Sequence, residues 1–145
     1  MAACVVVLPA SAGTSRPADL ARAVIVEWTA GSPEVAWKTL HPAHQRVVSQ
    51  RKFAYCVRGG RGEKIYPTRV AIASSRKVEI DRPEIAQHMG WTVRLVVRRH
   101  AGRQWLISDW RLQVVRTHRG LRWLLDPSSF EQYRRFRHEP KTCPE

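Results

Sequence analysis

Residues 91–126 contain three runs of alternating apolar and polar residues, joined by two short turns that each hold a glycine. From Val93 to Val97 every second residue is apolar, a period of two that indicates a half-buried β-strand. The turns around Gly102 and Gly120 have the length of hairpin loops. The stretch therefore predicts an antiparallel meander of three neighbouring strands, which restricts the chain to folds that contain such a sheet.

The middle run of the meander carries apolar residues on both of its faces. Trp110 and Leu112 share one face, whereas Asp109 has the opposite parity and lies beside apolar residues of its own face. We expect the first face to point into the domain and the second to form an outer surface. The residues expected there, as a face for a protein partner or a homodimer, are Trp105, Ile107, Arg111 and Val115.

Helical patterns precede the meander. Residues 17–29 form an amphipathic stripe that begins with a proline, and a second short helix is expected after Ser32 and Pro33. A third helix is expected from Pro42 or Ala43 to about residue 57. Further along, residues 68–80 alternate again and predict two strands or one long bent strand, and residues 127–136 predict a short terminal helix.

The length of 145 residues fits one domain. We assign residues 17–138 to it and residues 139–145 to a polar tail. Residues 1–16 form an apolar arm or the remainder of a signal peptide, because a short apolar run precedes small residues but no basic leader precedes that run. An exported or cell-surface location is therefore as well supported as a cytoplasmic one, and no run is long enough to span a membrane.

The chain is strongly basic, with 25 lysines and arginines, 12 acidic residues and a net charge of +13. Such a charge raises nucleic acid or another polyanion as a partner. However, the basic residues are mostly arginines scattered over all predicted elements, which a bias of composition also produces. We therefore keep a nucleic-acid-binding module as an alternative and do not favour it.

Three cysteines bear on the compartment. If the arm is removed with Cys4, the pair Cys56 and Cys143 remains and can join the tail to a helix by a disulfide. The simpler interpretation is a buried thiol at Cys56 and an idle one at Cys143, and we prefer it here because the spacing gives no distance. No metal site is expected, since cysteines and histidines do not cluster, and no cofactor is expected.

The order of these elements resembles the nuclear transport factor 2-like superfamily. The similarity covers about residues 17–136 and is most evident in residues 36–56 and in the hairpin of residues 105–125, which ends in Trp-Leu-Leu-Asp-Pro. It implies an α+β fold in which three N-terminal helices pack on a strongly curved antiparallel sheet of four to five strands, followed by a short C-terminal helix. The resulting cone holds a pocket, whose expected lining is Trp28, Trp37, Tyr55, Trp110 and Leu112.

Enzymes of this superfamily need a carboxylate base inside the cone and an electrophilic partner. Asp109 and His44 are weak candidates here. The parity of Asp109 directs it outward, towards Arg94 or Arg111 on the surface, and His44 sits beside a helix break where histidines commonly cap. We therefore expect no catalytic residue and favour a non-catalytic module that binds a small apolar ligand or a protein partner. An isomerase, dehydratase or hydrolase is the first alternative, and it requires Asp109, Asp81 or a histidine to be buried in the pocket.

Overall fold

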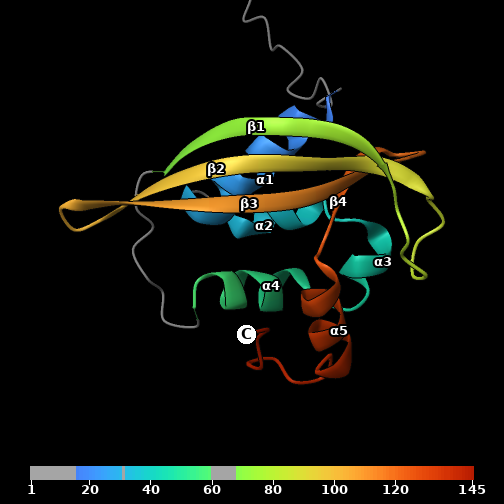
Figure 1. The fold of residues 1–145 in the computed structure, drawn as a ribbon. Coiled ribbons are helices and arrows are strands. Elements are labelled where there is room, and N and C mark those ends of the chain that lie inside the picture. Colours follow the sequence, from blue (N-terminus) through green and yellow to red (C-terminus); the bar gives the residue numbers. More distant parts are fainter. Residues whose placement is uncertain (1–15, 31, 60–67) are drawn as a thin grey trace, which may run out of the picture.

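The computed structural model describes residues 16–30, 32–59 and 68–145. Most of the predicted N-terminal arm, residues 1–15, lies outside the described residues. Within these ranges four helices precede a four-stranded sheet, and one helix follows it (Figure 1). The helices are α1 (Pro17–Ala30), α2 (Pro33–Lys38), α3 (Pro42–Gln45), α4 (Gln50–Val57) and α5 (Pro127–Arg135), and the strands are β1 (Thr68–Glu79), β2 (Met89–Ala101), β3 (Gln104–Thr117) and β4 (Gly120–Leu124).

The predicted meander and the α+β class are confirmed. The strands are antiparallel neighbours in the order β1-β2-β3-β4. In the register of the sheet, Leu95 lies opposite Trp110, and Val114 lies opposite Trp123. These pairs therefore share the inner face. β1 is one long strand whose pairing slips between Ile72 and Ser74, and so the alternative of one bent strand holds.

The predicted third helix is wrong as a single element. The chain forms α3 and α4 instead, and the segment between them turns away from a helical path. The Oγ atom of Ser49 accepts a hydrogen bond from the backbone N–H of Lys52 and starts α4 anew. Val47 and Val48, which lie in the break, are both buried.

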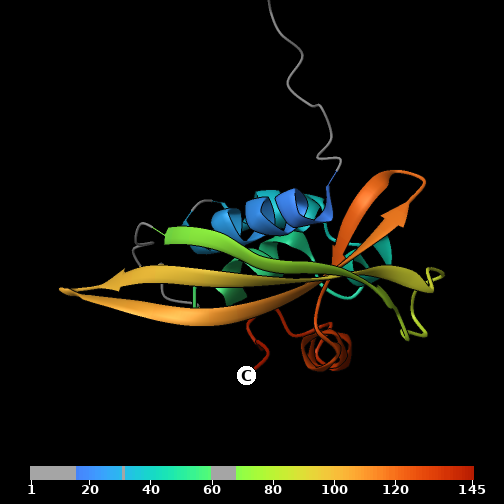
Figure 2. The ribbon, with the colours of Figure 1, turned by 45° about the horizontal axis from the view of Figure 1, so that its top comes forward.

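The helices cover one face of a curved sheet, and the other face points outward (Figures 1 and 2). Three residues of β2, Val93, Leu95 and Val97, are fully buried and belong to the main core. The apolar stripe of α1 packs in the same core, where removal of its side chains from water stabilises the fold. The stripe consists of Leu20, Ala21, Val24 and Ile25.

A second, smaller core lies at the far end of the sheet and includes Val115, Ile80 and Leu124. Val115 is fully buried, so its predicted place on an exposed partner face is wrong. The strands β2 and β3 approach closely there, at Gly90. A Cβ atom at this position would lie only 2.5 Å from the carbonyl oxygen of Val114, so a larger residue would not fit without a shift. The strongly bent end of the sheet, where β4 turns up towards the side of α1 (Figure 2), brings this second core together.

Candidate functional site: a tryptophan cleft

A cleft of about 540 Å³ opens between α1, the C-terminal half of β3, and the junction of β4 with α5. Trp28 comes from α1, Trp110 and Leu112 come from β3, and Trp123 comes from β4. We call this the tryptophan cleft. The fold thus brings together three of the expected lining residues, Trp28, Trp110 and Leu112. Trp110 and Leu112 share a face because they are two positions apart in β3.

The indole ring of Trp28 packs against the other two indoles of the cleft. The ring centroid of Trp28 lies 5.7 Å from that of Trp110 and 5.3 Å from that of Trp123. The indole N–H of Trp123 donates to the carbonyl oxygen of Ala36, and that of Trp110 donates to the hydroxyl of Ser108. Because both of these donors already have partners, neither indole offers the cleft a hydrogen bond. Trp110 is half-buried and offers the cleft apolar ring surface, whereas Trp123 is fully buried beneath it.

The rim of the cleft is polar and partly acidic. Glu79, Asp81 and Asp126 line it, and all three are exposed. Asp126 is the N-cap of α5, where its carboxylate accepts hydrogen bonds from the backbone N–H and the hydroxyl of Ser129 at 2.9 and 2.6 Å. The rim carboxylates therefore remain in water, and none of the three is enclosed by the apolar part of the cleft.

Asp109 lies on the outer face of the sheet. Its backbone is opposite Val96, and its carboxylate is 3.8 Å from the guanidinium of Arg94. The aspartate side chain is 71% exposed. Asp109 does not line the tryptophan cleft, and a pair this exposed contributes little to stability.

His44 is fully buried, but outside the cleft. Its Nδ1 atom accepts a hydrogen bond from the backbone N–H of Leu125 at 3.0 Å, so the neutral ring carries its proton on Nε2 and donates to Glu84 at 3.1 Å. Arg82 approaches the same glutamate oxygen at 2.6 Å and also donates to the carbonyl oxygen of Leu125. Burial, with Arg82 nearby, lowers the pKa of His44 to about 4.

His41 has a similar structural role. Its Nδ1 atom accepts a hydrogen bond from the N–H of Ala43 and caps α3, and its Nε2 atom lies 3.0 Å from the side-chain oxygen of Gln87. Burial lowers the pKa of His41. The two histidines are therefore neutral, and their hydrogen bonds connect the segment of residues 80–88 to α3.

Two of the residues expected to line the pocket lie elsewhere. Trp37 is half-buried, and its indole N–H donates to the carbonyl oxygen of Val48 at 2.9 Å. It joins α2 to the break between α3 and α4. Tyr55 is half-buried on α4. Neither Trp37 nor Tyr55 is among the described residues that line the tryptophan cleft.

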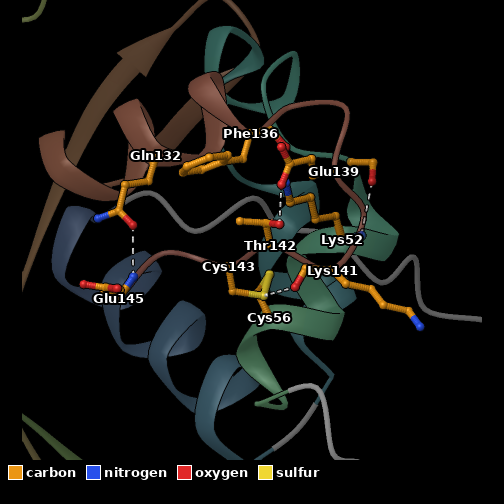
Figure 3. The surroundings of a disulfide bond; sticks show 10 residues. Lys52, Cys56, Gln132, Phe136, Glu139, Lys141, Thr142, Cys143 and Glu145 are labelled. Carbon is orange, nitrogen blue, oxygen red and sulfur yellow. Dashed lines mark hydrogen bonds between the residues drawn. A yellow bond between two sulfur atoms is a disulfide. The ribbon is translucent and has the colours of Figure 1, made fainter.

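The C-terminal tail is joined to α4 by a disulfide between Cys56 and Cys143 (Figure 3), so the preferred interpretation of two free thiols is wrong. The two Cα atoms are 5.4 Å apart, although 87 positions separate them in the sequence. The ammonium group of Lys52 donates to the carbonyl oxygen of Phe136 at 2.5 Å and holds the start of the tail. The tail is therefore fixed at both of its ends to the helical side of the domain.

The tail lines a second hollow of about 220 Å³ next to the tryptophan cleft. Trp28 lines both, and the terminal residues Pro144 and Glu145 line only the smaller one. The backbone N–H of Glu145 donates to the side chain of Gln132 at 3.0 Å. The disulfide thus positions the tail beside this smaller hollow, which shares Trp28 with the tryptophan cleft.

Sequence reasoning missed Trp123, Arg82 and Glu84. Trp123 belongs to a short run of alternating apolar residues. The predicted pairing of that run with β3 is the signal that could have placed Trp123 beside Val114 on the inner face. Arg82 and Glu84 carry no such signal, since they lie in a polar loop. Their burial depends on contacts with His44 and Leu125, which are about 40 positions away along the chain.

Among the described residues, the helices are too short or too polar to cross a membrane. Comparisons of the chain with protein-family models, with curated proteins and with solved structures find no match.

Proposed function

We propose that this protein is a non-catalytic binding module with the cone-shaped fold of the nuclear transport factor 2-like superfamily, and that it holds a small apolar ligand in the tryptophan cleft. The observation that carries the proposal is the convergence of Trp28, Trp110 and Trp123 on one cleft of about 540 Å³. Ligand pockets of this size are typically lined by apolar and aromatic side chains, with few polar groups.

The cleft also indicates the chemistry of the ligand. A flat or branched apolar body fits the ring surfaces of Trp28 and Trp110, which are only partly buried by the protein itself. At the polar edge, Thr92 and Gln113 line the cleft and can hydrogen-bond one polar group of the ligand. The indoles of Trp110 and Trp123 already donate within the protein, so apolar contact supplies most of the expected affinity.

The ionisable groups support binding rather than catalysis. A general base works best with a pKa near the operating pH and close to the reacting atom. Asp81 and Glu79 reach only the exposed rim of the cleft, and Asp109 points away from it. His44 is buried behind the cleft lining, and both of its ring nitrogens are already hydrogen-bonded.

A titration with the neutral fluorophore N-phenyl-1-naphthylamine tests the proposal. Trp110→Ala is expected to weaken binding by about tenfold, because it removes an aromatic wall of the cleft. Trp110→Phe keeps an aromatic ring and is expected to lose less affinity. Trp105→Ala is the matched control, since it removes an exposed indole from the opposite end of β3.

Thermal unfolding of each variant shows whether it is folded at the temperature of the titration. If folded Trp110→Ala and Trp110→Phe bind the fluorophore as tightly as the wild type, the tryptophan cleft is not the binding site. Equal losses in Trp110→Ala and Trp105→Ala also contradict the proposal, because they indicate adsorption to any exposed indole.

A further inference from the structure

The β2–β3 hairpin ends in three consecutive large apolar residues that are exposed. Trp105, Leu106 and Ile107 are 46%, 47% and 65% exposed. We call residues 98–107 the hairpin tip. Both ribbon views show it projecting from the edge of the domain beyond the helices (Figures 1 and 2). Exposing three bulky apolar side chains in a row is unfavourable in water, and a patch of this kind marks an interaction site.

The apolar side chains of the hairpin tip lie on both of its faces. Trp105 is paired with His100, and Ile107 is paired with Arg98 on the outer face of the sheet. Leu106 has the opposite parity and is paired with Arg99. A protein partner docked on one face of the ribbon leaves the other face in water. A surrounding apolar phase, into which the tip inserts, covers both faces at once.

Arginines surround the apolar triplet. Arg69 of β1 lies opposite Arg98, and its guanidinium sits over the indole of Trp105 at 5.7 Å. Arg99 and Arg103 are also exposed at the tip. The nearest acidic residue along β3, Asp109, is already beside Arg94. The tip therefore combines apolar side chains with a local positive charge.

We propose that the hairpin tip binds to an anionic lipid membrane surface, with Trp105, Leu106 and Ile107 inserted at the interface and the arginines on the lipid phosphates. Tryptophan favours the interfacial region, and arginine binds phosphate with several donors. Each basic residue near an anionic bilayer adds to the attraction. This surface is separate from the tryptophan cleft, and the proposal does not depend on the cleft binding a ligand.

Nucleic acid explains the structure less well. Phosphates of a nucleic acid can contact the arginines, and Trp105 can stack on a base. Leu106 and Ile107 have no ring to stack and would remain in water on opposite faces. The Cys56–Cys143 disulfide also fits an oxidising compartment better than the cytosol or nucleus, where disulfides are rare and where most nucleic acid lies.

Co-sedimentation of the full chain with large unilamellar vesicles tests the proposal. The probe is a vesicle of phosphatidylcholine in which about one lipid in three is the anionic phosphatidylglycerol. We expect binding to these vesicles and weak binding to vesicles of phosphatidylcholine alone. The triple variant Trp105→Ser, Leu106→Ser, Ile107→Ser is expected to lose at least about tenfold in partitioning. Replacing Arg98 and Arg103 by glutamine is expected to lower it by about fivefold per arginine.

Two controls have matched chemistry. Met89→Ser removes an exposed apolar side chain from the other end of β2, and Arg119→Gln removes an exposed arginine from the β3–β4 turn. Both are expected to bind vesicles nearly as the wild type does. Lipids brominated in their acyl chains should quench the fluorescence of Trp105, and Trp105→Phe should lose that component.

Three results would overturn the proposal. One is the absence of wild-type sedimentation with the anionic vesicles at about 0.1 M salt, where surface charges are only partly screened. Another is unchanged vesicle binding by the folded triple serine variant, which would mean that charge attraction alone accounts for the binding. The third is tight binding of single-stranded DNA through the same arginines without binding to vesicles, which would assign the tip to a nucleic acid.

Discussion

His44 shows how one buried side chain can connect distant segments. It lies in α3, receives a hydrogen bond from Leu125, which directly follows β4, and donates one to Glu84 in the loop after β1. Arg82 completes the group by contacting both Glu84 and Leu125. A proton on Nδ1 of His44 would face the N–H of Leu125, so the junction is satisfied only by the neutral ring.

This junction predicts a pH dependence of stability. The pKa of His44 is about 4 in the folded chain, whereas a histidine of the unfolded chain has a pKa of about 6.5. As the pH falls between these two values, the unfolded chain takes up a proton that the folded chain does not. The free energy of unfolding is therefore expected to fall across this range by up to about 3 kcal/mol, and to stop falling through His44 below it.

Urea unfolding at several pH values between 7 and 4 measures this effect. His44→Asn is the matched variant, because an asparagine oxygen can accept near the position of Nδ1 but does not titrate. The variant is less stable at neutral pH but should show a shallower fall. His41, whose pKa is also lowered by burial, contributes in both proteins. Parallel curves for wild type and variant would contradict the assigned pKa.

At the scale of elements, the sheet is better predicted by sequence than the helices are. Strand alternation is a local pattern of period two, and the parity of Asp109 and Trp110 correctly separated the outer face from the inner one. The helical pattern of residues 42–57 did not reveal its interruption. Val47 and Val48 lie in this interruption, and both are buried in the main core.

The new start of α4 depends on Ser49. Ser49→Ala is expected to lower the free energy of unfolding by about 1 kcal/mol, because it leaves the N–H of Lys52 without its side-chain acceptor. Ser32→Ala is the matched control. Ser32 is the N-cap of α2, but its side chain makes no capping hydrogen bond, so its replacement should cost no more than about 0.5 kcal/mol. Chemical denaturation compares the two, and equal losses would argue against a special role of Ser49.

At the scale of the whole molecule, the disulfide joins the C-terminal tail to α4, more than 80 positions earlier in the sequence. The tail then lines the smaller hollow, which shares Trp28 with the tryptophan cleft, so this covalent link positions residues next to the cleft. Links between residues far apart in sequence restrict the unfolded chain strongly, and this restriction is the usual explanation of their stabilising effect.

Removing the link is expected to destabilise the protein by about 2–4 kcal/mol. We expect this loss for Cys143→Ser in a Cys4→Ser background, measured by urea unfolding without reductant. Adding reductant should bring the parent protein to the same stability and leave the variant unchanged. Lys141→Ala alters the exposed tail but keeps the link, and should unfold as the parent does. Full labelling of Cys56 by a thiol reagent in the native, unreduced parent would show that the disulfide does not form.

The sequence by itself determined the meander, the α+β class and the faces of β3, because alternation and turn residues act over a few neighbouring positions. Only the tertiary structure decided which residues meet. It placed Trp123 with Trp28 in one cleft, moved Trp37 and Tyr55 away from it, buried Val115 and brought Cys143 to Cys56. Such contacts depend on how the sheet bends and how the loops return, and these are properties of the packed molecule that no local spacing contains.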